Sequence, residues 1–328
     1  MNLLKQLYGI HSPSGNEKRM RKFIRRYIRK NIPQAQCWGD QYGNLYVTKG
    51  EAADYPCLVS HLDQVQHPYP KDYRIFETDE IIFAYSASQR SFCGLGADDK
   101  NGIWICLRCL EKYPTLKVAF FADEERGCNG SSKADMAFFN DTRFILEPDR
   151  RGKRDLITQI GFSTLCSKVF YDAIQPGLYG YIEESGMMTD IEALRKRGYP
   201  NSCVNLSCGY FDPHTSHEFT QKKDLLNCLD FVSHIIETID TAYPCDDVGG
   251  YWGDDLWAKD EEFSELLDLL DYDILESPDA NPTAADLYVM YKPQFPSLTK
   301  SDYEIALRFV MENKGISEDE TDCFGIRR

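Results

Sequence analysis

Histidines and carboxylates occur in five short stretches of this chain whose residue types suit metal chemistry. The stretches are His61-Leu62-Asp63, residues 96–102 (GADDKNG), Asp123-Glu124-Glu125, Glu147-Pro148-Asp149, and His214 with Glu218. Two adjacent aspartates, Asp98 and Asp99, do not suit a core segment, because a buried charge must be paired or must bind a metal. At the start of a helix such a pair favours a cation, although aspartates there can also simply cap the helix.

The pair His61 and Asp63 fits a metal ligand with a supporting acceptor. A metal-bound histidine typically donates its other ring N–H to a carboxylate. If the chain turns at Leu62, Asp63 can hold the imidazole from behind. Three other histidines lack a comparable acidic neighbour, and we interpret them as structural or surface residues: His11, His67 and His234.

Glu124 and Glu125 are adjacent, so both are not expected to serve one metal from a straight strand. At a strand end the two side chains can diverge, and one can bind metal while the other stays free as a base for water. A hydrolytic metal site needs this division of roles. The alternative is that residues 123–125 are only the acidic start of a helix.

These stretches lie at or just beyond the ends of apolar, strand-like runs. The runs cover residues 57–60, 116–122, 144–146 and 203–208. Binding residues of open α/β sheets collect at the carboxyl ends of strands, and helices alternating with buried strands indicate a largely parallel sheet. We therefore expect an α/β fold with a mixed, largely parallel central sheet covered by helices on both faces. Residues 74–87 predict a separate hairpin that turns at residues 78–80.

The charge of the chain is concentrated at its C-terminal end. The net charge is −15 over 328 residues, which argues against nucleic acid as a partner. Residues 246–328 hold 21 acids and 7 bases, a net of −14. We therefore expect a catalytic domain over residues 1–244 and a small, acidic, mainly helical extension over residues 245–328. An apolar stretch should pack this extension on the catalytic body or on a partner subunit: Trp252, Trp257, Phe263, Leu266, Leu267, Leu269 and Leu270.

The sequence carries no signal for a membrane or for secretion. No segment approaches the roughly 20 apolar residues that a spanning helix needs, and residues 1–10 lack the basic, apolar and small-residue pattern of a signal peptide. The twelve cysteines are scattered and lie mostly inside apolar runs, which is typical of reduced, buried thiols. We expect a cytoplasmic protein without a membrane partner.

Together the motifs HLD, GADDKNG, FADEE, EPD and HTSHE resemble, in this order, those of the dinuclear zinc exopeptidase superfamily. That superfamily includes peptidase T, the carboxypeptidase G type, secreted leucine aminopeptidases, and glutamyl and deblocking aminopeptidases. The resemblance covers roughly residues 1–240. It extends to residues 12–17 (SPSGNE), to Thr189-Asp190 and to residues 198–200 (GYP).

The resemblance implies a pair of zinc ions bridged by Asp99, with Glu124 as the general base and Asp63 behind the first histidine. The remaining metal ligands would be His61 and Asp149 for one ion, and Glu125 and His214 for the other. It also implies a cis peptide bond after Asp99. Nitrogen and oxygen donors of this kind suit zinc, and cobalt or manganese would also bind.

Two of these placements have a competitor. Glu147 competes with Asp149, and His217 competes with His214. Members of the superfamily place the final histidine four positions before a glutamate, which favours His214 with Glu218.

The spacing of the motifs implies a compact architecture. Asp149 and His214 are 65 positions apart, which leaves no room for the large lid domain of the related carboxypeptidases and of peptidase T. The resemblance therefore implies a metal-dependent exopeptidase for short peptides, most simply an aminopeptidase, and it allows a homo-oligomer. One alternative is an N-acyl amino acid deacylase or carboxypeptidase that uses Arg126, Arg150 and Arg151 for a substrate carboxylate. Another is a peptide-binding scaffold without catalysis.

Overall fold

The protein forms two compact units in a computed structural model, Met1–Val248 and Gly249–Arg328. The structure describes residues 1–66, 68–161, 163–245, 262–263, 265–267, 269–270, 283–300, 302–303 and 306–307.

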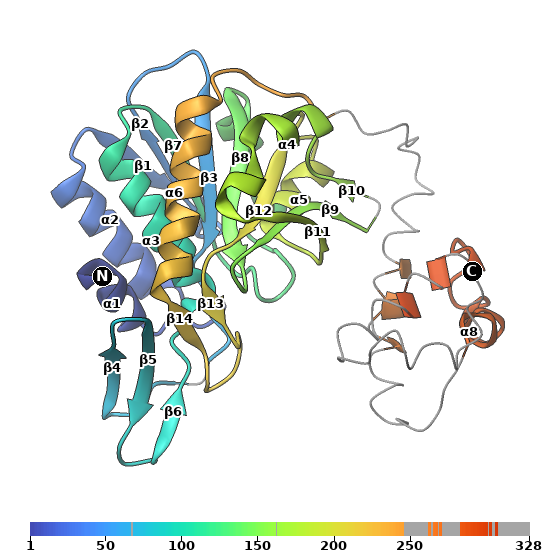
Figure 1. Cartoon of the computed structure of the whole chain (residues 1–328), viewed down its shortest axis with the longest axis horizontal. Coiled ribbons are helices and arrows are strands. Elements are labelled where there is room, and N and C mark those ends of the chain that lie inside the picture. The colour runs from blue at the N-terminus through green and yellow to red at the C-terminus, as the bar shows by residue number, and fades with distance from the viewer. Residues whose placement is uncertain are drawn as a thin grey trace. The chain divides into compact units, whose positions relative to one another are not determined.

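A nine-stranded mixed sheet forms the centre of the first unit (Figure 1). Its strands are β1 (Ala35–Gly39), β2 (Leu45–Lys49), β3 (Tyr55–His61), β7 (Leu116–Phe121), β8 (Thr142–Arg150), β9 (Asp155–Ile160), β10 (Ser163–Thr164), β11 (Ile182–Gly186) and β12 (Cys203–Ser207). The order is β1-β2-β7-β3-β8-β12-β9-β10, and β11 also pairs with β9. The four middle strands β7, β3, β8 and β12 are parallel, which confirms the predicted fold class.

Helices cover both faces of this sheet because successive side chains of each buried strand point to opposite faces. The helices are α1 (Asn2–Tyr8), α2 (Lys18–Asn31), α3 (Ala97–Lys112), α4 (Lys168–Ile174), α5 (Asp190–Lys196) and α6 (Lys222–Thr238), with short 3₁₀ turns η1 (Ser131–Lys133), η2 (Met136–Phe139) and η3 (Pro176–Tyr179). Leu58 and Val118 lie in a core with residues of α1, α2, α3 and α6. Their neighbours Val59 and Ala119 lie in a second core with residues of η2 and α5.

A second, five-stranded sheet joins two distant segments of the chain. It contains β4 (Tyr73–Glu77), β5 (Ile81–Ser86), β6 (Ser91–Cys93), β13 (Tyr210–Phe211) and β14 (Phe219–Gln221). The order is β13-β14-β5-β4, and β6 pairs with β5. β4 and β5 form the hairpin predicted over residues 74–87. The pairing of β5 with β14 was not predicted, because contacts between such distant segments leave no local sequence pattern.

The second unit has a hydrophobic core of its own. Helix α8 (Ala284–Tyr291) is capped by Thr283 and Asp286, and the described core residues are Phe263, Leu266, Leu270, Leu287, Phe295, Leu298, Tyr303, Ala306 and Leu307. Three residues of the apolar stretch predicted to pack on another surface are therefore buried within this unit. Trp252 and Trp257 lie outside the described residues. The packing of the extension on the catalytic body or on a partner stays a prediction.

Among the described residues, no helix combines the length and the apolar character needed to cross a membrane. The described cysteines are all free thiols, and all but Cys37 are buried.

Candidate metal centre

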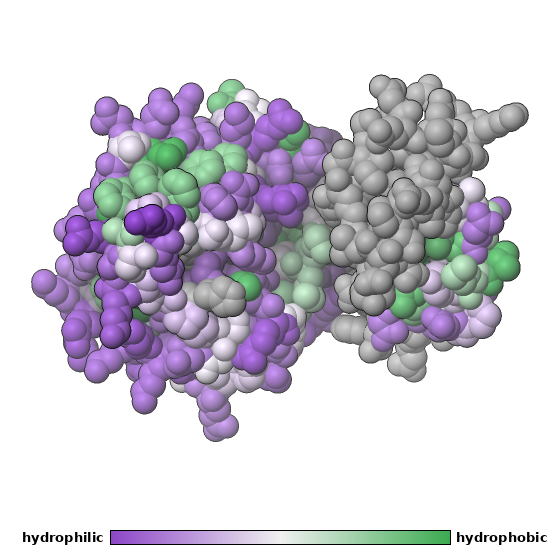
Figure 2. Space-filling view, turned by 90° about the horizontal axis from the view of Figure 1, so that it is seen from below, coloured by the Kyte–Doolittle hydropathy of each residue, from purple (hydrophilic) through white to green (hydrophobic). Residues whose placement is uncertain are grey.

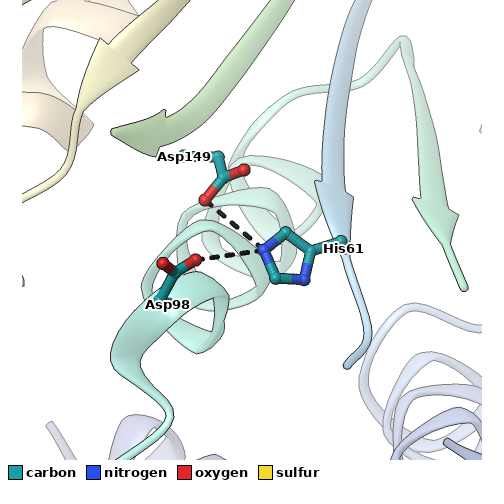
Figure 3. A group of neighbouring side chains, drawn as sticks. All are labelled: His61, Asp98 and Asp149. Atoms are coloured by element: carbon teal, nitrogen blue, oxygen red, sulfur yellow. Dashed lines mark hydrogen bonds and ion pairs between the residues drawn. The ribbon is translucent and has the colours of Figure 1, made fainter. Parts of the chain in front are cut away.

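His61, the last residue of β3, lies within a buried group of acids. Its Nε2 atom is 3.1 Å from Asp98 Oδ1 and 3.5 Å from Asp149 Oδ1. Figure 3 shows the three side chains converging from β3, from the start of α3 and from the end of β8. Ligand atoms of these residues all lie within 4.8 Å of one another. One imidazole nitrogen and two carboxylate oxygens so close together can share a metal ion.

Asp98 also belongs to a second group. Its Oδ2 atom is 3.2 Å from His214 Nε2, and the same nitrogen is 3.0 Å from Glu125 Oε2. Ligand atoms of Asp98, Glu125 and His214 lie within 4.8 Å of one another. The two groups thus meet at one carboxylate, each at a different oxygen, which is the arrangement that a bridged pair of ions requires.

Asp98, and not the predicted Asp99, lies between the two histidines. The carboxylate of Asp99 instead accepts hydrogen bonds from Ser60 Oγ at 2.5 Å and from the backbone N–H of Gly102 at 2.8 Å. A Cβ atom at Gly102 would overlap that carboxylate, so glycine is required there. The cis peptide bond is also one position earlier than expected, at Asp98–Asp99. We therefore replace Asp99 by Asp98 in the candidate ligand set.

Glu218 holds the turn that carries Asp98. It accepts hydrogen bonds from the backbone N–H of Gly96 at 2.6 Å and of Asp98 at 3.1 Å, and from Gln66 Nε2 at 2.9 Å. Because Glu218 follows His214 by four positions, this buried carboxylate links the His214 loop to the Asp98 turn. The sequence analysis did not predict these hydrogen bonds from Glu218 to the turn of Asp98.

His217, the competitor of His214, lies outside both groups. Its ring is exposed and its centroid is 5.7 Å from that of Phe92. His214 therefore remains the candidate ligand.

Asp63 supports more than the ring of His61. Its Oδ1 atom is 3.4 Å from His61 Nδ1. The same carboxylate accepts hydrogen bonds from the backbone N–H of Glu124 at 3.0 Å and of Glu125 at 3.2 Å, and from Ser14 Oγ at 2.7 Å. The turn with the two glutamates is thereby fixed to the end of β3. Glu125 then reaches His214, while Glu124 Oε2 lies 3.8 Å from His61 Nε2 and belongs to neither group.

Of the two acids at the end of β8, Asp149 is the one that faces His61. Its backbone is held by the Asn205 amide, which accepts from the Asp149 N–H at 3.3 Å and donates to its carbonyl at 3.1 Å. Glu147 instead accepts hydrogen bonds from the Thr189 hydroxyl and from the first backbone N–H of α5. Glu147 thus anchors α5 to the sheet.

The charges of the site favour a bound cation. Burial and the neighbouring carboxylates raise the pKa of Glu124 and of Asp149 well above the ordinary range. Hydrogen bonds to its two carboxylate neighbours raise the pKa of His214 to about 10. Burial alone would lower the pKa of His61, but Asp149 and Glu124 outweigh it and raise the pKa. Within the part of the chain that the structure describes, Glu125 Oε1 is buried without a hydrogen-bond partner. This set of nitrogen and oxygen donors fits zinc, cobalt or manganese.

Known proteins share this architecture at low sequence identity. An aminopeptidase PepT from Bacillus cereus superposes with a TM-score of 0.58 at 13% identity, over 72% of this chain and 97% of its own. A tripeptidase from Staphylococcus aureus gives 0.58 at 15%, over 72% and 96%. The TET1 peptidase of Pyrococcus horikoshii, which can assemble into a tetrahedron or a large octahedral shell, gives 0.55 at 14%, over 72% and 98%. The chain has the fold of these peptidases.

Sequence comparison gives a shorter match. No family model matches the chain. A LysW-lysine/LysW-ornithine hydrolase from Pyrobaculum aerophilum is 32% identical over 68 residues, which span 21% of this chain and 19% of that protein. The fold implied by the motif resemblance is therefore confirmed over most of the chain, whereas the match to a relative by sequence spans about a fifth of it.

Several residues beside the candidate ligands escaped the sequence analysis. Asn205 on β12 and Tyr210 on β13 both contact Asp149, the latter through its hydroxyl at 3.4 Å. Gln66 bonds Glu218. No sequence signal marks these residues, because single polar side chains after apolar runs are common.

A third group of acids lies beside the site, formed by Glu17, Asp63 and Asp123. Each of these carboxylates already accepts hydrogen bonds within the chain, for example Asp123 from the Tyr42 hydroxyl at 2.9 Å. The group contains no histidine, and we do not assign a metal to it.

Proposed function

We propose that the chain is a metal-dependent exopeptidase that hydrolyses short peptides as an aminopeptidase. The observation that carries this proposal is the pair of ligand groups joined at Asp98, with Glu124 beside them and outside both. One zinc ion would be held by His61, Asp98 and Asp149, and the other by Asp98, Glu125 and His214, which form the two candidate groups. Cobalt or manganese is an alternative.

Bound zinc would polarise the scissile carbonyl and lower the pKa of water at the site. Glu124 then has the role of general base: it takes a proton from the attacking water and returns it to the leaving amine. Its 3.8 Å approach to His61 places it at the edge of the first group. The burial of Glu124 favours proton uptake, which this role requires. Asp63 keeps Glu124 in place through the backbone N–H of that residue.

The contacts of the arginines favour an aminopeptidase over a deacylase. A deacylase would use Arg126, Arg150 and Arg151 to bind the carboxylate of its substrate. Two of these side chains already face acids of the chain: Arg126 bonds Asp123 at 2.6 Å, and Arg150 Nε lies 3.6 Å from Asp155 Oδ2. The acids at the site favour a positively charged peptide N-terminus. The names of the structural neighbours, an aminopeptidase and a tripeptidase, support the same choice.

The test is hydrolysis of matched free and N-acetylated di- and tripeptides by the zinc-loaded protein, with Glu124→Gln as the control for contaminating peptidases. Cleavage that requires a free N-terminus and is lost in the control supports the proposal. Cleavage of the acetylated series alone would instead select a deacylase. Binding of both series without cleavage would select a scaffold.

A further inference from the structure

One face of the second sheet presents aromatic side chains to solvent. The register places Phe76 opposite Phe83, Tyr85 opposite Phe92, and Phe211 opposite Phe219. Residues directly opposite in antiparallel strands lie on the same face. We call this the aromatic face: Phe76, Ile81, Phe83, Tyr85, Phe92, Phe211 and Phe219. The alternate residues Ile82, Ala84 and Ser86 are buried on the other side.

The rings of the aromatic face pack against one another without being covered. Phe83 is stacked on Phe76 with centroids 5.5 Å apart, and Phe92 makes edge contacts with Phe83 and Tyr85, both at 5.7 Å. Phe76 is 42% exposed and Phe92 is 46% exposed. In Figure 2, which views the first unit from the end where β4, β5 and β6 project, apolar surface gathers over that end.

The size of this face can be set against that of a protein interface. β4 and β5 have five and six residues, whereas β6, β13 and β14 have three, two and three. At about 3.3 Å per residue and about 4.8 Å per strand, the face covers roughly 300 Å². The largest apolar patch of a typical monomer measures about 300–600 Å² and is often functional. A standard interface buries about 800 Å² per partner, so the loops around this face must contribute the rest.

Exposed charges sit at opposite ends of β5. Asp79 and Glu80 form the turn before it, whereas Arg74 lies opposite Tyr85 near its end and Arg90 follows in the next turn. Within the described residues, none of these four side chains forms an ion pair. Two faces packed with their β5 strands antiparallel would bring each acidic turn onto the partner's basic end. A parallel packing would bring like charges together.

We propose that the aromatic face binds a second copy of this chain, around a two-fold axis that sets the two β5 strands antiparallel. Such an interface is self-complementary, because the same patch is used twice. Faces of β-sheets pack about 10 Å apart in aligned arrangements. The proposal goes beyond the proposed peptidase activity and does not depend on it.

The proposed interface reaches the candidate metal centre. Phe92 contacts His217, in the loop that carries His214. A Cβ atom at Gly94, just after β6, would lie 2.6 Å from the Thr215 carbonyl of that loop, so strand and loop are closely packed. Association of two copies would therefore restrict the movement of the loop that carries His214, a candidate ligand in the group of Asp98, Glu125 and His214.

The test is sedimentation velocity of the full chain from about 1 to 100 µM, the range suited to an interface of modest area. The expected result is a shift from the 37.8 kDa of one chain to twice that mass. Phe92→Asp should weaken association at least tenfold. Leu178→Asp, at a position 72% exposed on η3, is the matched control and should leave association unchanged.

The charge arrangement has its own test. Arg74→Glu should weaken association, and adding Glu80→Arg in the same chain should restore it, because each altered residue then meets its altered partner. A protein that stays monomeric throughout the concentration range overturns the proposal. So does a dimer that is indifferent to Phe92→Asp. A monomer in which Phe92→Asp raises only the KM for apolar peptides would make this face a substrate surface instead.

Discussion

The choice of Asp98 over Asp99 as candidate ligand can be tested directly, because an Asp→Asn change at each position should affect the zinc content differently. Each oxygen of Asp98 faces a different histidine, at 3.1 Å and 3.2 Å. Asparagine offers one oxygen and one NH₂ group, so Asp98→Asn can serve only one of the two ligand groups. We expect bound zinc to fall from two ions per chain to one. The site that loses its ligand should bind at least about 100-fold more weakly, about 2.7 kcal/mol.

Asp99→Asn should behave differently. The asparagine oxygen can still accept from the Gly102 N–H, and the Ser60 hydroxyl can rotate to accept from the NH₂ group. The loss of one charge-assisted bond costs about 1–3 kcal/mol of stability, but the zinc content should stay at two. Zinc is counted by mass spectrometry on gel-filtered protein, with a thermal melt for stability. Two ions in Asp98→Asn together with a loss in Asp99→Asn would refute the reasoning.

Three further changes test the remaining roles. Glu124→Gln should keep two zinc ions and lower kcat by about 10²–10⁴-fold, because only the base is lost; loss of an ion would show instead that Glu124 is a ligand. His214→Ala should lose one zinc ion and His217→Ala none, measured side by side on the same preparation, and the reverse pattern would contradict the assignment. Glu218→Gln should weaken zinc binding about tenfold, because an NH₂ group would then face the N–H donors of the Asp98 turn. The circular dichroism spectrum should stay unchanged. An unchanged zinc affinity would argue against a positioning role for Glu218.

The sequence predicted the central sheet because its strands are continuous apolar runs, and such runs identify strands buried on both faces. It placed His61 and Asp149 at the same sheet edge for the same reason. It could not distinguish Asp98 from Asp99 as the candidate bridging ligand, because two adjacent aspartates have the same chemistry. The choice between them depends on backbone angles, ψ of 104° at Asp98 and 43° at Asp99, that turn the two side chains to different neighbours. It did not predict the pairing of β14 with β5, because these two strands are distant in the chain and contacts between distant segments leave no local sequence pattern.

The candidate site is assembled from segments that lie far apart in the chain, and buried carboxylates that bind no metal in this scheme hold those segments together. Asp63 fixes the turn of Glu124 and Glu125 to β3, and Glu218 fixes the turn of Asp98 to the loop of His214. Both acids act on backbone N–H groups through charge-assisted hydrogen bonds, which are about twice as strong as neutral ones. A metal site needs its ligands within about 0.5 Å of their working positions. Because these bonds are made by side chains other than the candidate ligands, they position the two ligand groups without using the ligand atoms themselves.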